Sequence, residues 1–296
     1  MLMADRHRHL HARHAMRRIG ALAWILALGC IVASARAQTP WLVTLTDGSA
    51  SVIEGARRVE AAVGYKAAAG AIVETAPEAL LLRLESSDEV SIDLGPATQV
   101  MIDPPDMRRR DGPRPRLYLL RGWVKVSRHG AAQAPAVRTP LLDSGTAEGV
   151  VVIQVAGKEE AVFVESGRVE LAGRERRGPL QALAAGQFFT IAAGAAGSMS
   201  PRPPVDWIAH VPRSFRDPIP LRAPQLEGAA APKLVILPPP SYAELSPWLN
   251  GEPELRRPFP RRFVALARRA EFRRGLESQM PAPPEWDPVL HPPPPP

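Results

Sequence analysis

The chain has little of the chemistry that most often marks a functional site. Of its 296 residues one is a cysteine and 5% are aromatic. That cysteine, Cys30, lies in an N-terminal apolar stretch, so the rest of the chain offers no disulfide, thiolate nucleophile or cysteine metal site. No His or acidic cluster has metal-ligand spacing, and there is no phosphate-binding glycine loop and no nucleophile elbow. We therefore expect neither a metal nor a cofactor.

The N-terminus has the three parts of a secretory signal. Residues 19–35 form an uncharged apolar run that follows Arg17-Arg18 and is followed by the small-residue site Ala35-Arg36-Ala37. This pattern predicts a signal peptide over residues 1–37, cleaved after Ala37, and a periplasmic or secreted mature protein. Met16 is a second candidate start, because it would open a signal of ordinary length. An uncleaved N-terminal anchor and lipidation at Cys30 remain as lower-ranked alternatives.

Cleavage would remove most of the excess positive charge. The whole chain has 37 Lys and Arg against 30 Asp and Glu. Residues 1–37 hold six arginines and one aspartate, so 31 basic and 29 acidic residues remain. The high isoelectric point is then no argument for nucleic-acid binding, and we expect no nucleic-acid partner. No further apolar run is long enough to cross a membrane, so the mature chain is expected not to be membrane-spanning.

Histidine is also scarce outside the leader. Four of the seven histidines, His7, His9, His11 and His14, precede Met16. The other three are isolated from one another in the sequence: His129, His210 and His291. A lone histidine in a loop is usually only solvated, so these residues do not suggest a serine-hydrolase triad.

Residues 38–196 read as many short strands separated by turn residues. Val90, Ile92 and Leu94 alternate with polar residues, as do Val124 and Val126, which indicates strands with one buried and one wet face. Regularly spaced short strands predict a mainly β fold, a roll or sandwich. We expect strands at Trp41–Leu45, Ala50–Glu54, Ala79–Glu85, Glu89–Leu94, Thr98–Ile102, Leu117–Leu120, Trp123–Arg128, Val150–Val155, Ala161–Glu165, Arg168–Ala172 and Gln187–Ile191.

A glycine-centred pattern recurs within this region. Residues 118–126 and 163–171 each contain an apolar strand, a glycine and an alternating strand, and residues 183–189 are a shorter copy. The central glycines, Gly122 and Gly167, permit the positive φ of a tight turn or a bulge. Hairpin chemistry alone explains this repeat, so it supports the architecture and carries no information about function.

Proline dominates the C-terminal part, residues 197–296, which holds most of the 34 prolines. Proline opposes helix interiors and central strands, so we expect an extended, polyproline-like extension with one or two helices. Ser241 and Glu244 form a capping-box start for a helix near 241–249. Pro260 would open a longer helix over 260–280 with one apolar face. The aromatic residues of this part predict that it packs on the β domain or on a partner.

The order of the strand motifs resembles that of the FecR domain, the extracytoplasmic domain of iron-citrate-type regulators that is also found in secreted bacterial proteins. The resemblance covers roughly residues 41–195. It rests on Gly70–Thr75, Leu80–Leu84, Val90–Leu94, Gly95–Val100, Leu120–Val124, Val137–Pro140, Gly145-Thr146, Val162–Val169 and Leu183–Gln187.

The FecR resemblance implies a FecR-like β fold and a place in the cell envelope. It is compatible with a non-enzymatic binding or scaffolding module whose partner is an envelope protein or polymer that the sequence does not identify. The iron-citrate regulators carry a cytoplasmic segment and a membrane span before this domain, where this chain has a signal peptide. Control of a sigma factor is therefore not implied, although a role as the sensor partner of a membrane regulator stays open.

One segment has the residues of a catalytic turn. Leu141–Thr146 resembles the active-site turn of retroviral-type aspartic proteases, in which two aspartates share a proton to activate water. Asp143 would be the catalytic residue, and the chain would have to dimerise. The second half of the protease pattern has no clear match. The alternative is that Asp143-Ser144-Gly145 is an ordinary turn, which these residues favour.

A cluster of arginines marks the predicted helix 260–280. It could contact an anionic lipid, a wall polymer or an acidic protein. We favour a solvated helix face that pairs locally with Glu271 and Glu277. The cluster consists of Arg261, Arg262, Arg268, Arg269, Arg273 and Arg274.

Overall fold

The computed structural model describes residues 40–105, 107, 115–131, 134–174, 180–278 and 284–292. The chain divides into two units, Met1–Gln38 and Thr39–Pro296. The first unit lies outside the described residues, and so do the predicted signal peptide 1–37, Met16, Cys30 and the cleavage site at Ala37. The second unit is described by itself. We call its residues 40–200 the strand region and residues 201–292 the extension.

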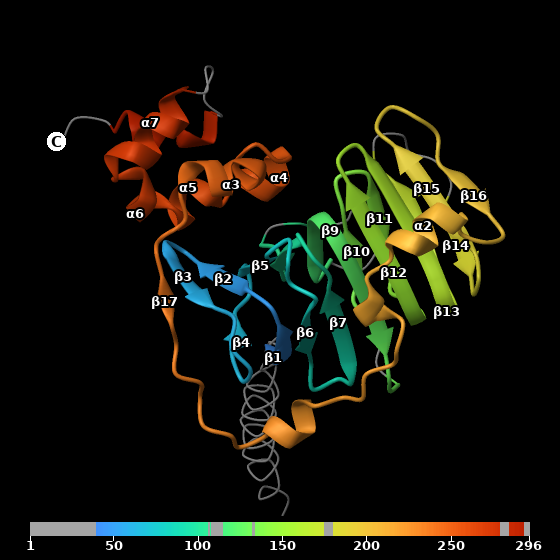
Figure 1. Cartoon of the computed structure of the whole chain (residues 1–296). Helices are drawn as coiled ribbons and strands as arrows, with labels where there is room; N and C mark the ends of the chain where they lie inside the picture. Colours follow the sequence, from blue (N-terminus) through green and yellow to red (C-terminus); the bar gives the residue numbers. More distant parts are fainter. Residues whose placement is uncertain are drawn as a thin grey trace, which may run out of the picture. The chain divides into compact units, whose positions relative to one another are not determined.

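The strand region is mainly β, as the sequence predicted, and the described helices all follow residue 200 (Figure 1). All the described strands belong to one hydrogen-bonded network. The strands of this region are β1 (Trp41–Asp47), β2 (Ala50–Glu54), β3 (Arg57–Glu60), β4 (Lys66–Ala67), β5 (Ile72–Thr75), β6 (Leu81–Glu85), β7 (Val90–Leu94), β8 (Gln99–Ile102), β9 (Leu117–Arg128), β10 (Val137–Arg138), β11 (Leu142–Ser144), β12 (Glu148–Ala156), β13 (Glu159–Gly173), β14 (Gln181–Ala184), β15 (Phe188–Ala192) and β16 (Ser198–Ser200).

Two long strands, β9 and β13, run through the predicted glycine pivots. Gly122 has φ 94° and Gly167 has φ 76°, but each lies inside a continuous strand, within about two residues of a break in register, so both belong to bulged stretches and not to hairpin turns. A Cβ on Gly122 would come within 2.5 Å of the Thr98 Cα, and one on Gly167 within 1.5 Å of the Glu148 carbonyl oxygen. Four predicted short strands are therefore two long ones, because a bulge bends a strand without ending it.

The bend in β9 lets one strand pair with two sets of neighbours. Before Gly122, β9 pairs with β8 and, in parallel, with β10. After it, the same strand pairs with β7 and β12, and β13 continues from β12 to β14 and β15. The two bulged strands thus link β8 and β10 to β7, β12, β14 and β15.

The prediction that one face of the sheet is solvent-exposed is wrong for β7 and for the second half of β9. Val90, Ile92 and Leu94 are buried, but so are Ser91 and Asp93, which are 0% and 2% exposed. In β9 the polar Lys125 is buried as well. The reason is that residues of the extension cover this face, which the alternation of strand residues alone does not reveal.

The extension contains short helices and one strand. Its first part holds α2 (Val205–His210), the 3-10 turns η1 (Arg213–Phe215) and η2 (Ala223–Leu226), and β17 (Ile236–Leu237), which pairs with β3. Its second part, residues 241–292, we call the helical segment. It consists of α3 (Tyr242–Leu249), α4 (Pro253–Arg256), α5 (Phe259–Arg262), α6 (Val264–Ala267), α7 (Ala270–Ser278), η3 (Pro284–Trp286) and α8 (Asp287–Leu290).

Helix α3 starts at the predicted capping box. The Ser241 hydroxyl accepts from the Glu244 amide, and the Glu244 carboxylate accepts from the Ser241 amide. The single helix predicted over 260–280 is instead divided into α5, α6 and α7, and Met280 lies outside the described residues. The chain leaves helical geometry at Phe263, whose φ is −105° and ψ 16°, and this break accompanies the complete burial of Phe259 and Phe263.

The extension shares two of the three apolar cores with the strand region. One contains Ile53, Ile72, Met101 and Tyr118 of the strands together with the helical segment, whose Trp248 ring lies 6.2 Å from that of Tyr118. The other joins Leu81, Trp123 and Val152 to Phe215 of η1. The third core lies between the strands, apart from Leu234 at its edge. No helix within the described ranges has the length and apolar character needed to cross a membrane.

Candidate functional site

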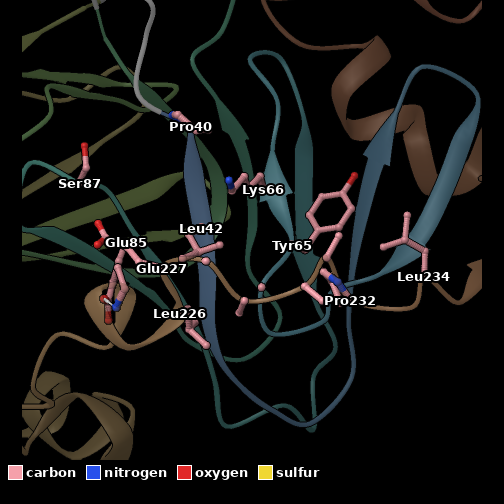
Figure 2. A pocket seen from close by; sticks show the side chains of 16 residues that line it. Pro40, Leu42, Tyr65, Lys66, Glu85, Ser87, Leu226, Glu227, Pro232 and Leu234 are labelled. Atoms are coloured by element: carbon pink, nitrogen blue, oxygen red, sulfur yellow. Dashed lines mark hydrogen bonds between the residues drawn. The ribbon is translucent and has the colours of Figure 1, made fainter.

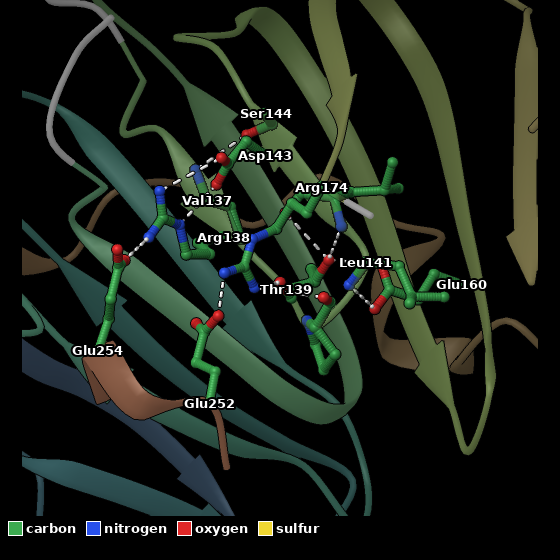
Figure 3. Close-up of polar contacts among 12 residues, drawn as sticks. Val137, Arg138, Thr139, Leu141, Asp143, Ser144, Glu160, Arg174, Glu252 and Glu254 are labelled. Atoms are coloured by element: carbon green, nitrogen blue, oxygen red, sulfur yellow. Dashed lines mark hydrogen bonds and ion pairs between the residues drawn. The ribbon is translucent and has the colours of Figure 1, made fainter. Parts of the chain in front are cut away.

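The aspartate singled out by the sequence lies in a strand and is held by an arginine. Asp143 belongs to β11 and stands opposite Arg138 of β10 in the antiparallel register. The Arg138 Nε donates to Asp143 Oδ1 at 2.6 Å, and its Nη2 donates to Oδ2 at 3.2 Å (Figure 3). The neighbouring Ser144 hydroxyl accepts from the Val137 amide at 2.8 Å. Asp143 and Ser144 therefore lie not in a turn but in a strand that pairs with β10 on one side and with β13 on the other.

The same arginine joins the strand region to the helical segment. The third nitrogen of Arg138, Nη1, donates to the Glu254 carboxylate at 3.0 Å. Close by, Arg174 bonds to Glu252 and also donates to the carbonyl oxygens of Thr139 and Pro140. The two glutamates stand at the start of α4 (Figure 3). Two arginines of the strand region thus bind two carboxylates at one end of a helix in the extension, where the helix dipole favours negative charge.

A buried carboxylate supports the loop between β10 and β11. Glu160 is 2% exposed and accepts from the Thr139 hydroxyl and from the Leu141 amide, the latter at 2.8 Å. Burial raises the pKa of Glu160 to about 7, although these hydrogen bonds and the nearby charge of Arg174 act in the opposite direction. The Thr139 hydroxyl in turn accepts from the Leu142 amide at 2.9 Å. Glu160 therefore positions the loop whose carbonyl oxygens receive Arg174.

The ion pairs of this polar cluster connect the strand region to the helical segment. Both oxygens of Asp143 are hydrogen-bonded to one guanidinium, which is strong, geometrically specific pairing. An aspartic protease needs its two carboxylates to face each other and share one proton. A carboxylate paired in this way with a guanidinium stays ionised and does not share a proton with a second carboxylate, so the geometry disfavours Asp143 as half of a catalytic pair.

A hollow of about 670 Å³ lies between β1, β4 and residues 223–234 of the extension. Its volume falls in the range of about 300–1,000 Å³ that is typical of ligand pockets. We call it the β1–β4 hollow (Figure 2). Apolar side chains supply most of its wall, among them Pro40, Leu42, Tyr65, Leu226, Pro232 and Leu234.

The polar groups of the β1–β4 hollow differ in their burial and in their hydrogen bonding. Glu85 is fully buried and accepts from the Thr44 hydroxyl and from the amides of Arg222 and Ala223. These bonds fasten the start of the wall formed by the extension. Lys66 is exposed at the edge of the hollow. Burial and the charge of Glu54 raise the pKa of Tyr65 to about 12, so its hydroxyl stays neutral at physiological pH.

The arginine cluster of the helical segment is divided by the fold. Arg262 donates to the backbone carbonyl oxygens of Gly70 and Ile53, and burial lowers its pKa to about 10. Arg273 pairs with Glu277 at 2.7 Å, as predicted, and also donates to the Leu290 carbonyl. The remaining members are exposed: Arg261, Arg268, Arg269 and Arg274.

The three histidines that follow residue 37 do not come together. His129 lies 3.0 Å from the Ser91 hydroxyl, His210 bonds within α2, and His291 pairs with Asp287 at the end of α8. Among the described residues, no three His, Cys, Asp or Glu side chains are grouped as metal ligands.

Sequence reasoning missed the residues that fasten the extension. Arg83 is 2% exposed and pairs with Asp93 at 2.6 Å, and it also donates to the carbonyl oxygens of Ile219 and Pro220. Lys125 pairs with Glu165 at 2.8 Å and donates to the Phe215 carbonyl. A charged residue within an apolar run, such as Arg83 in Leu80–Leu84, is the sequence signal from which this covered face could have been predicted.

Comparisons with known proteins add little to this geometry. No family model matches the chain, and no curated protein matches it. Two crystal structures of a "putative anti-sigma factor" from Parabacteroides distasonis, at 2.50 Å and 1.65 Å resolution, are similar to it with a TM-score of 0.35 and 14% identity. The similarity covers 44% of this chain and 59% of those chains, so the chain spans less than two thirds of their length. A likeness of this size carries no argument about function.

Proposed function

We propose that the chain is a non-enzymatic, FecR-like binding module of the bacterial cell envelope, and that the β1–β4 hollow receives an apolar segment of an envelope protein. The observation that carries this proposal is the hollow itself, an apolar space of about 670 Å³ beside an exposed lysine. Most binding sites combine such a wall with a few polar groups at the rim. Location in the envelope rests on the predicted signal peptide and on the FecR resemblance.

The wall of the hollow formed by the extension favours a binding role. Residues 224–231 are mostly exposed, and the run Gly228–Ala231 carries side chains no larger than methyl. The wall is fastened at one end by Glu85 and at the other by β17, which pairs with β3. A segment that is held at both ends and carries small side chains between them can shift to fit a bound side chain, without unfolding of the strands behind it.

Site-specific photo-cross-linking tests the proposal. A benzoylphenylalanine at Leu226, inside the hollow, is expected to cross-link one envelope protein in the producing cell. The matched control places the same group at Leu180, which is 59% exposed and does not line the hollow. Equal cross-linking at both positions, or none at Leu226, would remove the hollow as the binding site.

The peptidase hypothesis has its own test. Proteolysis at acid pH is measured for the wild type and for Asp143→Asn. We expect no activity above background in either protein, because the Arg138 guanidinium is hydrogen-bonded to both oxygens of Asp143. Activity in the wild type that Asp143→Asn abolishes would replace the binding module with an aspartic peptidase.

A further inference from the structure

A second hollow lies on the sheet where α2 crosses it. It is an open depression of about 390 Å³ above the ends of β12, β13, β15 and β16. The strand register places Gln154, Ala161, Thr190 and Ser198 directly opposite one another across these four strands. Opposite residues of paired strands project from the same face of a sheet. The floor of the hollow is therefore the small apolar side chain of Ala161. The amide of Gln154 lies on one side of it, and the hydroxyls of Thr190 and Ser198 lie on the other.

An indole forms one wall of this hollow. Trp207 of α2 packs on the next row of the sheet, with its ring 4.9 Å from Phe188 and 5.9 Å from Phe163. Its Nε1 donates to the Gln154 side-chain oxygen at 2.6 Å, which fixes both groups. Trp207 is half-buried and lines the hollow. A ligand in the hollow would meet part of a rigid aromatic ring and the amide nitrogen of Gln154.

The charge of the lining restricts the ligand. Among the described residues that line this hollow the ionisable side chains are Glu159 and Glu160, with no Lys, Arg or His. Glu160 is committed to the loop at Thr139 and Leu141, so the exposed Glu159 is the charge that a ligand would meet. Such a site repels phosphates, sulfates and carboxylates. Neutral hydroxyl and amide groups outnumber the single carboxylate, which favours a neutral ligand rich in hydroxyls.

We propose that this hollow, which we call the Trp207 hollow, binds a neutral pyranose sugar. The C–H face of a pyranose is weakly positive and suits the negative face of an indole. Its hydroxyls match the hydrogen-bonding groups of Gln154, Thr190 and Ser198, and Glu159 can accept from a further hydroxyl. The site is separate from the β1–β4 hollow, so this inference goes beyond the function proposed above and does not depend on it.

Calorimetric titration of the full chain tests the inference. The probes are maltotriose and tri-N-acetylchitotriose, two neutral oligosaccharides, with tetramethylammonium as the competing cation. We expect at least one sugar to bind with a dissociation constant of about 1 mM or lower. Thr190→Val removes one hydroxyl and is expected to weaken binding about five-fold, whereas Thr190→Ser retains affinity. Ala156→Trp fills the hollow and should abolish binding.

The matched control is Thr46→Val, which makes the same substitution in β1 outside the hollow and should leave sugar affinity unchanged. Sugar binding that is insensitive to Thr190→Val and to Ala156→Trp would overturn the inference. The absence of binding by either sugar would also overturn it. If tetramethylammonium binds where the sugars do not, the hollow is a cation site formed by Trp207 and Glu159.

Discussion

The strand region and the extension are held in place by different means. In the strand region, apolar side chains at alternate positions meet between paired strands, as Val43, Leu84 and Ile92 do. The extension has few such patterns and is fastened at separate points, by large aromatic side chains and by cations of the strand region. Trp248 and Phe215 are both fully buried in cores shared with the strands.

Proline explains part of this difference. A proline-rich chain has lost many N–H donors but keeps every carbonyl acceptor. Arg83 donates to the carbonyls of Ile219 and Pro220, and Lys125 to that of Phe215. Buried cations on the polar face of the sheet therefore supply the donors that the extension lacks. Charged residues in an alternating strand can thus be the docking points of a distant proline-rich segment.

The largest effect is expected from removal of Trp248, the aromatic side chain that packs the extension against the strand region. Trp248→Ala removes a fully buried side chain that packs on Tyr118 and should reduce the free energy of unfolding by about 3–5 kcal/mol. Trp41→Ala, in the core between the strands, is the matched control and should cost a similar amount. Urea unfolding followed by circular dichroism measures both. A Trp248→Ala protein that loses helical signal while its strands unfold at the wild-type midpoint would mean that the extension is a separate unit.

A second substitution removes a polar anchor. Arg83→Ala leaves Asp93 buried without its ion-pair partner and should cost about 3–5 kcal/mol, because an uncompensated buried charge is expensive. The double variant Arg83→Met with Asp93→Leu removes both charges and is expected to recover part of this loss. Equilibrium unfolding compares the two proteins. A double variant no more stable than Arg83→Ala would show that the unpaired charge of Asp93 is not what makes the loss of Arg83 costly.

The third prediction concerns pH. Glu160 has a pKa near 7 in the folded protein and about 4.3 when unfolded, so the folded state binds its proton more tightly. Its contribution to stability is complete below about pH 4 and is lost as the pH rises through 7. Glu160→Gln should flatten the pH dependence of the free energy of unfolding between these values by roughly 3–4 kcal/mol. Identical pH profiles for the two proteins would mean that Glu160 titrates normally.

The smallest effect is expected at the surface of the helical segment. Arg273 and Glu277 pair on α7, but both side chains are more than a third exposed. Glu277→Ala should therefore change the free energy of unfolding by no more than about 0.5 kcal/mol. Glu252→Ala, at the pair with the partly buried Arg174, is the comparison and should cost more. A larger loss of unfolding free energy for Glu277→Ala than for Glu252→Ala would contradict the expectation that exposed ion pairs stabilise the protein less than the pairs that join the extension to the strand region.

Local patterns were enough to predict most of the strands and the start of α3. Alternating apolar residues located β2 at Ala50–Glu54 and placed β1, β6, β7, β8 and β15 within about two residues. The capping box at Ser241 and Glu244 formed because its two hydrogen bonds join residues three positions apart. Such interactions depend on neighbouring residues alone, so the sequence displays them directly.

Contacts between distant residues could not be predicted in this way. The glycine at 122 indicated a positive φ, but its role as a bulge depends on the approach of Thr98. The long helix expected over 260–280 is interrupted where Arg262 bonds to the carbonyls of Gly70 and Ile53, about 200 positions earlier, and where Phe263 joins a core shared with the strands. Asp143 looked catalytic because its partner Arg138 is recognisable only once β10 and β11 pair. The hollows likewise depend on where the extension crosses the sheet.

Hydrogen exchange tests most directly whether the extension is part of the same folded unit. The amides of Leu245 in α3 and of Asn250 at its C-cap bond to the carbonyls of Ser241 and Ser246, beside the buried Trp248. We predict that they exchange only when the whole unit unfolds, at rates close to those of Val126 and Val152 in the central strands. Exchange of the α3 amides orders of magnitude faster than that of the central strands would contradict the account.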